Sequence, residues 1–265
     1  MSGHVRMAET FPRWVDILGV RVDDVTMRES LEFCLSALQR GGRYQIVTPN
    51  AEFVMLAQRD AGFRHIINHS ALSIPDGHSL LWASRLFGCP LREQVTGTDL
   101  AYGLAGLAAR EGYRLYLLGA AEGVAELAAR KLREHHPGLQ VAGTYSGSPA
   151  VSEDEQLRAR IAAAAPVDIL LVAYGAPAQD KWIARNLSQM NVRLAMGVGG
   201  VFDFFSGRVP RAPKWVRDAG FDWLYRLAHQ PWRLRRQLTI PSFLALVLTR
   251  RLSGYRGAYE TRLPT

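Results

Sequence analysis

Asp76, which stands between a proline and a glycine, is the residue of this chain best suited by its position to acid–base chemistry. Pro75-Asp-Gly77 follows the short apolar run Ala71–Ile74 and precedes a helical pattern that begins near His78. A carboxylate at the end of a strand acts as a general base when burial brings its pKa toward the working pH. Aspartate before a helix is more commonly an N-cap. The pattern by itself favours the cap and leaves the base open.

Two further motifs carry hydroxyl, amide or carboxylate groups just before a helical pattern. Thr48-Pro-Asn50 offers a hydroxyl and an amide, which would grip a sugar or a phosphate. The alternative is that Asn50 simply caps the following helix. Thr96-Gly-Thr-Asp99 is equally ambiguous, because Thr98 or Asp99 would cap the next helix.

Glycine-rich turns supply a third kind of candidate. Gly119-Ala-Ala-Glu-Gly123 follows a strand-like run, so its backbone N–H groups would cradle a phosphate at a helix N-terminus. It is not a complete Gly-x-Gly-x-x-Gly motif, and a ligand-free βα turn is the alternative. Gly175-Ala-Pro-Ala-Gln-Asp-Lys-Trp182 places Gln179, Asp180 and Lys181 at a helix start, within reach of a ligand.

Several classes of site have no matching pattern. The seven histidines lack metal-ligand spacing, no Asp-x-Asp follows an apolar strand, and no nucleophile elbow or Walker loop is present. We therefore expect no metal and no other cofactor. With only Cys34 and Cys89, no disulfide framework is possible, which indicates a cytoplasmic setting. The longest apolar stretch, Ile240–Leu248, falls well short of the ~20 residues of a spanning helix, and no signal peptide is apparent.

The elements that must position these motifs alternate between β-branched runs and helical periodicity. This alternation predicts an α/β fold with a largely parallel sheet covered by helices on both faces. In such sheets ligands bind at the carboxyl ends of the strands, where the polar motifs stand. The expected strands are Tyr44–Thr48, Arg114–Leu118, Leu139–Tyr145, Asp168–Tyr174 and Arg193–Val198, and the expected helices are Ala51–Asn68, His78–Phe87, Asp99–Glu111, Glu122–His135, Glu153–Ala164 and Gln179–Gln189.

The C-terminal part of the chain has a different character. Residues 208–265 hold 12 Lys and Arg against 3 Asp and Glu, with tryptophans interleaved, whereas residues 1–207 hold 20 against 21. We expect helices over 214–229 and 231–252, interrupted at Pro231 and Pro241. Such a tail suits an anionic membrane surface, while helices packed on the body are the alternative. Nucleic acid is disfavoured, because no nucleic-acid-binding module accompanies the charge.

Taken in order, the motifs resemble the WecG/TagA/CpsF family of bacterial glycosyltransferases. Each motif alone is weak, but the ordered set is specific and covers most of the chain. The matching segments are Thr48-Pro-Asn-Ala-Glu-Phe53, Pro75-Asp-Gly77, Val95-Thr-Gly-Thr-Asp-Leu100, Tyr116-Leu-Leu-Gly119, Gly143-Thr-Tyr-Ser-Gly147, Gly175-Ala-Pro-Ala-Gln-Asp-Lys-Trp182, Gly197-Val-Gly-Gly-Val-Phe-Asp203, Arg211-Ala-Pro-Lys-Trp215 and Trp223-Leu-Tyr-Arg-Leu227.

The resemblance implies a Rossmann-like catalytic domain, here residues 1–207, and a helical C-terminal appendage, residues 208–265, that meets the membrane. It implies inverting, metal-independent transfer of a hexose or N-acetylhexosamine, of the N-acetylmannosamine type, from a UDP-sugar. The acceptor would be a polyprenyl-diphosphate-linked sugar at the inner face of the cell membrane, in cell-wall or surface-polysaccharide synthesis.

The resemblance also implies roles for individual residues. Asp76 would be the general base, which reverses the preference for a cap, and Thr48 and Gln179 would position substrate beside it. The appendage arginines that meet the lipid diphosphate or the leaving UDP would be Arg226, Arg233 and Arg236. Further substrate-binding positions would be Asn50, Gly77, Thr96, Asp99, Gly119, Gly175, Gly199, Gly200, Asp203 and Arg211.

Two positions depart from the family pattern. Gln94 stands where the family usually has Arg, so a contact to donor phosphate would be lost or supplied by another arginine such as Arg92. Asp180 replaces the usual Glu.

The rival function is a nucleotide-binding adaptor that has no catalytic activity. The apolar residues Leu244, Leu246 and Val247 would contact a second subunit as readily as a bilayer.

Overall fold

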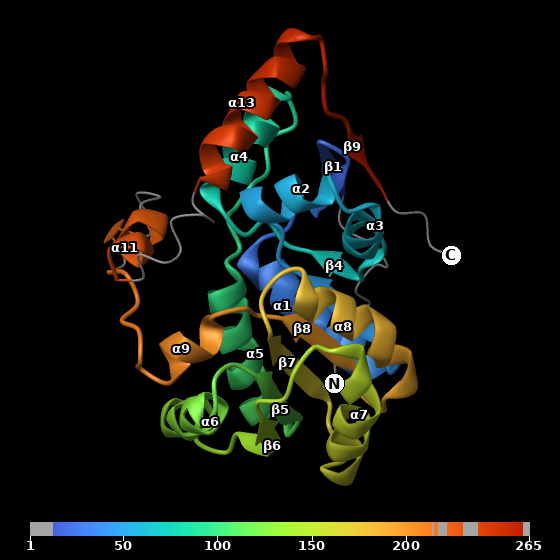
Figure 1. Cartoon of the computed structure of the whole chain (residues 1–265), viewed down its shortest axis with the longest axis vertical. Coiled ribbons are helices and arrows are strands. Elements are labelled where there is room, and N and C mark those ends of the chain that lie inside the picture. Colours follow the sequence, from blue (N-terminus) through green and yellow to red (C-terminus); the bar gives the residue numbers. More distant parts are fainter. Residues whose placement is uncertain (1–12, 214, 217–221, 230–237, 262–265) are drawn as a thin grey trace, which may run out of the picture.

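The computed structural model describes residues 13–213, 215–216, 222–229 and 238–261, and a six-stranded sheet forms its centre (Figure 1). Every strand pair in this sheet is parallel. All five expected strands are confirmed, and the run before Asp76 adds a short edge strand. In spatial order the strands are β4 (Leu72–Ser73), β3 (Tyr44–Val47), β8 (Leu194–Gly197), β7 (Ile169–Ala173), β5 (Arg114–Gly119) and β6 (Gln140–Tyr145).

Helices cover both faces of this sheet, as predicted, and make it a Rossmann-like α/β fold. Every residue of β7 is buried, which is typical of a central parallel strand. Alternate strand residues face opposite layers, so Leu117 and Leu118 enter different core clusters. One layer holds α1 (Met27–Arg40), α5 (Gly97–Glu111), α6 (Val124–His135) and α9 (Val201–Phe205), and the other holds α7 (Asp154–Ala163) and α8 (Ala178–Asn186).

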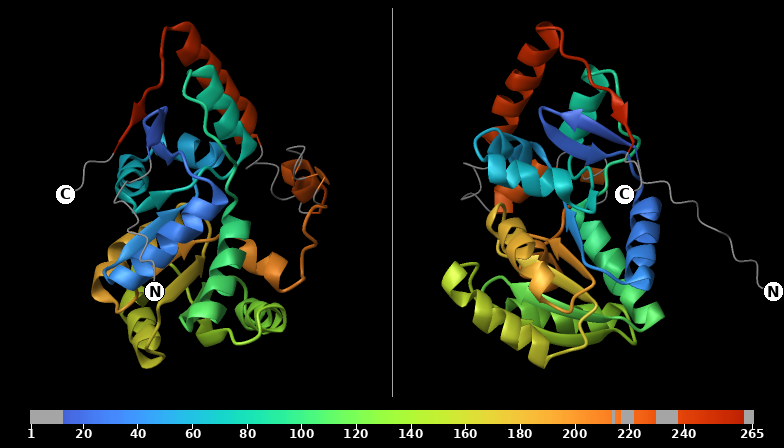
Figure 2. Two further views of the ribbon diagram at one scale, coloured as in Figure 1. Left: turned by 180° about the vertical axis from the view of Figure 1, so that it is seen from behind. Right: turned by 90° about the vertical axis from the view of Figure 1, so that its right-hand side faces the viewer.

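A second core lies beyond the β4 edge of the sheet. It is built around a three-stranded antiparallel sheet, in which the C-terminal strand β9 (Tyr259–Glu260) pairs with β1 (Trp14–Ile17), and β1 pairs with β2 (Val20–Asp23). Figures 1 and 2 show α13 beside α4 at the end of the molecule opposite β6. The helices of this core are α2 (Ala51–Ala57), α3 (Ala61–His69), α4 (His78–Leu86) and α13 (Thr239–Leu252).

The short strands β1, β2 and β9 and some element boundaries were not predicted from the sequence. The helix expected over Ala51–Asn68 is two helices, because the Asp60 carboxylate caps α3 by accepting the Phe63 N–H at 2.9 Å. Similarly, α5 begins at Gly97 with Thr96 as its cap, not Thr98 or Asp99. The expected break at Pro241 is wrong, since this proline lies in the first turn of α13, where no intrahelical N–H bond is needed.

The appendage is described only in part. Helix α11 (Asp222–His229) lies within the predicted helix 214–229, while residues 230–237, with Pro231, lie outside the described residues. The apolar face of α13 is not free for a partner, because Val247 is fully buried and Leu244 and Leu246 pack against the second core. None of the helices in the described ranges has both the length and the apolarity needed to cross a membrane.

A buried ion pair joins the second core to the edge of the six-stranded sheet. The Arg21 guanidinium donates to both carboxylate oxygens of Asp23 at 2.7 and 2.8 Å, and the side chains of both residues are almost fully buried. Asp23 also accepts the Ser73 N–H of β4 at 2.8 Å, and Arg21 donates to the Ser70 carbonyl at 3.0 Å. This pair therefore fixes β2 against β4, the strand that leads to Asp76.

Removing one partner of this pair is expected to destabilise the protein strongly. Asp23→Ala leaves the Arg21 guanidinium buried without its counter-charge, which costs about 3–5 kcal/mol of unfolding free energy. Urea denaturation measures this loss. The matched control is Glu32→Ala, which removes the carboxylate partner of the exposed Arg28 and changes stability little. Equal losses in the two variants would show that the buried pair does not hold the two parts together.

Candidate active site

The carboxyl ends of five adjacent strands gather the polar motifs at one edge of the sheet. Because the strands are parallel, the segments that follow β4, β3, β8, β7 and β5 emerge on the same side. The segments after β3 and β4 run together, since Ile74 donates its N–H to the Val47 carbonyl at 3.0 Å and Asp76 donates to the Pro49 carbonyl at 2.9 Å. The chain thereby brings Asp76 next to the Thr48-Pro-Asn50 turn.

Thr48 and Asp76 meet over a glycine. A Cβ atom placed on Gly97 would lie 3.2 Å from the Thr48 methyl carbon and 3.4 Å from Asp76 Oδ2. A side chain on the first residue of α5 would therefore crowd both of these groups. Thr48 is buried and Asp76 is half-buried, so the carboxylate is partly shielded from water while a substrate can still reach it. Gly97, to which the sequence analysis gave no role, is thus a third member of this cluster.

Asn50 caps a helix, as one of its two predicted roles requires, whereas Asp76 does not occupy a helix N-cap position. Asn50 caps α2, with its side-chain oxygen accepting the Phe53 N–H at 3.1 Å. The N-cap position of α4 falls on Gly77, one residue after Asp76. Gly77 has a φ of 141°, which favours glycine, and its Cβ would lie 3.6 Å from that of Asn50. Asn50 and Gly77 therefore line the same corner as Asp76.

Gln179 joins the turns that follow β7 and β8. Its side-chain oxygen accepts the Gly175 N–H at 3.1 Å and the Gly199 N–H at 2.8 Å, and only 2% of the residue is exposed. A Cβ on Gly197 would lie 2.6 Å from Gln179 Nε2, so a side chain there would displace the amide. Gly200, the residue after Gly199, is the N-cap of α9. The first turn of this helix contains Asp203, which is half-buried. Gln179 thus sets the shape of two glycine turns at the site edge.

Asp180 is a fully buried carboxyl beside this amide. Neither of its carboxylate oxygens has a hydrogen-bond partner among the described residues, although its backbone carbonyl accepts from Gln45 Nε2 at 3.0 Å. Burial raises the pKa of Asp180 to about 7, an effect that the nearby Gln179 side chain partly offsets. The shorter side chain that departs from the family pattern is therefore a buried carboxyl that takes up a proton near neutral pH.

A separate polar cluster forms at the start of α5. Thr96 Oγ1 donates to Asp99 Oδ2 at 2.7 Å and accepts the Asp99 N–H at 3.1 Å. Arg211 reaches the same carboxylate oxygen from the segment after α9, with its Nη2 at 2.7 Å. Three predicted substrate-binding residues thus lie together, and the ion pair orients the Arg211 guanidinium, which remains about one third exposed.

Arg92 is the candidate to replace the arginine absent at position 94. Its guanidinium pairs with Asp24 at 3.1 Å and with Glu29 at 2.7 Å, so its charge is used to hold α1. Arg92 is thus already paired with two carboxylates, and its contact with a donor phosphate stays a prediction. Arg211 is the arginine that the structure places beside the Thr96 motif.

The Gly119 turn owes its glycine to packing between strands. A Cβ at Gly119 would lie 2.8 Å from the Ala173 carbonyl carbon, and its φ of 103° is a further reason for glycine. Ala120 donates its N–H to the Ala173 carbonyl at 3.0 Å, which brings β5 and β7 close at the site edge. Gly175, at the end of β7, has a φ of 80° and an open space where its Cβ would stand.

The structure does not describe the side chains of the predicted appendage arginines. Arg226 lies in α11, where the description covers its backbone position but not its side chain, and Arg233 and Arg236 lie outside the described residues. Within the described ranges, no three His, Cys, Asp or Glu side chains are grouped to hold a metal ion.

The buried Asp180 predicts a dependence of stability on pH. Its pKa is raised on folding, so between about pH 4 and pH 7 the unfolded chain ionises this carboxyl while the folded chain keeps the proton. The contribution to unfolding free energy consequently falls by about 1.4 kcal/mol per pH unit over that window and is constant outside it. Asp180→Asn removes this term, so its stability relative to the wild type should rise between pH 4 and pH 7.

Urea denaturation of both proteins at a series of pH values measures this difference. A gap between the two unfolding free energies that does not change with pH would contradict the assignment of a protonated, buried Asp180.

Comparison with known proteins agrees with the geometry. The model of the Glycosyl transferase WecG/TagA/CpsF family matches residues 15–257. The N-acetylglucosaminyldiphosphoundecaprenol N-acetyl-beta-D-mannosaminyltransferase of Bacillus subtilis strain 168 is 34% identical over 203 residues, which are 77% of this chain and 78% of the relative. The proteins of the same name from Bacillus spizizenii and Staphylococcus aureus strain MRSA252 are each 32% identical, over 81% and 87% of this chain and 82% and 90% of their own lengths.

The matched segment contains the whole six-stranded sheet and every described site residue, from Thr48 to Arg211. The chain therefore belongs to the WecG/TagA/CpsF family and is a glycosyltransferase, as the ordered motifs predicted.

Proposed function

We propose that this enzyme transfers a hexose or N-acetylhexosamine, of the N-acetylmannosamine type, from a UDP-sugar to a polyprenyl-diphosphate-linked sugar. The family assignment and the names of the relatives support the transferred group and the acceptor class. The observation that carries the proposal is that Thr48 and Asp76 both line the space beside Gly97 at the carboxyl edge of the sheet. The product would enter the synthesis of a cell-wall or surface polysaccharide.

In the proposed reaction Asp76 is the general base. Its carboxylate takes the proton of the acceptor hydroxyl as that oxygen bonds to the anomeric carbon of the donor. The bond between the anomeric carbon and the phosphate oxygen breaks, and UDP departs with the electron pair on the opposite face. Attack and departure on opposite faces invert the anomeric centre. Thr48, whose side chain adjoins Asp76, would hold the acceptor or donor hydroxyl in place.

The departing diphosphate needs positive charge, and arginine supplies it in this proposal without a metal ion. Arg211 is oriented by its ion pair with Asp99 and remains partly exposed, which suits bidentate contact with phosphate. Arg226, Arg233 and Arg236 are proposed to add charge from the appendage. The turn N–H groups after β8, whose shape Gln179 fixes, would line the donor side of the site.

Asp76→Asn is expected to lower the turnover number by about a hundredfold or more, because the neutral amide cannot accept the proton. UDP release from UDP-N-acetylmannosamine with a short-chain polyprenyl-diphosphate-N-acetylglucosamine acceptor measures it, in the presence of EDTA. Glu111→Gln, at the exposed end of α5, is the matched control and should retain wild-type turnover. Turnover by Asp76→Asn at the wild-type rate would overturn the assignment of the base, and tight UDP binding without any turnover would favour the adaptor alternative.

We further propose that the enzyme works at the inner face of the cell membrane, bound peripherally through its C-terminal part. Support comes from side chains on the outer surface of α13, where Leu248 and Leu252 are 52% and 88% exposed. On the adjacent helix α4, Trp82 is 54% exposed. The neighbouring Arg85 and Arg251 supply positive charge for anionic headgroups. Apolar side chains beside cations are typical of an interfacial helix.

Replacing the two exposed leucines should weaken binding to anionic vesicles. Leu248→Gln with Leu252→Gln removes apolar surface that would enter the bilayer, so we expect about tenfold weaker cosedimentation with phosphatidylglycerol vesicles. The control is Val151→Gln. Val151 is 71% exposed and lies just before α7, which packs on the six-stranded sheet and not in the second core. Unchanged cosedimentation of the leucine variant would rule out α13 as the membrane contact.

A further inference from the structure

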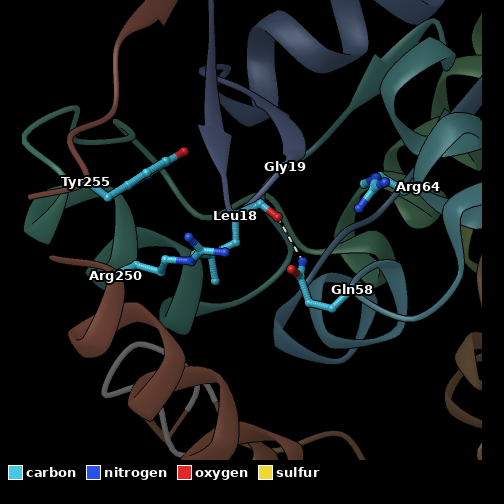
Figure 3. Close-up of a pocket in the computed structure, with 6 residues that line it drawn as sticks. All are labelled: Leu18, Gly19, Gln58, Arg64, Arg250 and Tyr255. Atoms are coloured by element: carbon cyan, nitrogen blue, oxygen red, sulfur yellow. Dashed lines mark hydrogen bonds between the residues drawn. The ribbon is translucent and has the colours of Figure 1, made fainter. Parts of the chain in front are cut away.

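A pocket lies at the turn between β1 and β2, apart from the candidate active site. Its volume is about 250 Å³, and six residues from separate parts of the chain line it (Figure 3). The pocket and the candidate active site lie at opposite ends of α2. Asn50, the N-cap of this helix, adjoins Asp76, whereas Gln58, its C-cap, lines the pocket. The lining residues are Leu18, Gly19, Gln58, Arg64, Arg250 and Tyr255.

The pocket is positively charged. Two of its six residues are arginines and none is acidic, and Figure 3 shows Arg64 and Arg250 on opposite sides of Leu18. Among the described residues, neither guanidinium has an ion-pair partner. Other arginines of the chain do pair with carboxylates in the same described ranges, namely Arg13, Arg21, Arg28, Arg92, Arg185, Arg193 and Arg211.

The carboxylate closest in sequence to the turn is already engaged. The Asp16 carboxylate accepts hydrogen bonds from the Tyr255 hydroxyl and from the Gly19 N–H, the latter at 2.9 Å. It is not among the lining residues. The charge of the two arginines is therefore available to a ligand that brings its own negative charge.

The frame around the arginines is fixed before any ligand arrives. Leu18 has a φ of 58°, in the left-handed region that leucine rarely adopts. Gln58 Nε2 holds this turn by donating to the Leu18 carbonyl at 2.8 Å and to the Val54 carbonyl at 3.1 Å. Positive φ at both Leu18 and Gly19 is what a two-residue hairpin turn requires, so this wall of the pocket is set by the hairpin itself.

We propose that this pocket binds a phosphate group, either free phosphate or the phosphate of a lipid headgroup. Two guanidinium groups around one cavity match the charge and the planar, bidentate geometry with which arginine binds phosphate. A cavity of about 250 Å³ holds a group much larger than one water molecule, whose share of liquid volume is about 30 Å³. The position of Arg250 on α13, between Leu248 and Leu252, makes a lipid headgroup as accessible to the pocket as a dissolved ion.

The test compares wild type with the double variant Arg64→Gln and Arg250→Gln. Isothermal titration with inorganic phosphate at constant ionic strength measures the free ion, and cosedimentation with phosphatidylcholine vesicles with and without phosphatidic acid measures the headgroup. The matched control is Arg130→Gln with Arg133→Gln, which removes two exposed arginines from α6 on the other sheet. Because no sugar transfer is assayed, the result does not depend on the proposed reaction.

We expect binding to weaken at least about tenfold in the double variant and to persist in the control. A loss of phosphate titration identifies a free-phosphate site, and a loss only of phosphatidic acid binding identifies a headgroup site. Equal behaviour of the double variant and the control in both assays overturns the proposal. Arg250→Gln alone, at an exposed position, gives the same comparison if the double variant does not fold.

Discussion

The side-chain amide of Gln179 is the interaction on which the geometry of the site edge depends. Its oxygen accepts backbone N–H groups from the turns after two neighbouring strands, β7 and β8. A glycine at 197 leaves the space that the amide fills, and the buried Asp180 stands next to it. Two turns that would otherwise be independent are therefore fixed relative to each other and to the sheet. Fixed backbone donors at a strand edge cost little reorganisation when a charged substrate binds.

The same principle of close approach brings the proposed catalytic pair together. Thr48 and Asp76 follow different strands, and both side chains lie close to the space beside Gly97 at the start of α5. The second core supports this corner from outside, because the buried Arg21–Asp23 pair ties β2 to β4 just before Asp76. The position of Asp76 therefore depends on a buried ion pair whose residues precede β4 by about fifty positions in the sequence.

The sequence was sufficient to predict the parallel sheet, its covering helices and the polar turns, because these follow from local periodicity and turn residues. It was not sufficient to predict the role of Gly97 or Gly197, since close approach depends on which strands become neighbours. The pairing of Arg92 with Asp24 and Glu29 likewise depended on where α1 packs, which local sequence does not determine. The burial of Asp180 depended on packing between α8, β3 and β8.

The most direct test of the central claim is a crystal structure of Asp76→Asn with a UDP-sugar and a short-chain lipid-diphosphate acceptor. The account predicts an acceptor hydroxyl within about 3 Å of the residue 76 side chain, facing the anomeric carbon of the donor, with the donor diphosphate near Arg211. An acceptor bound in line with the donor but more than one water molecule away from residue 76 would contradict it. In that case the corner formed by Thr48, Asp76 and Gly97 would not be where the transfer takes place.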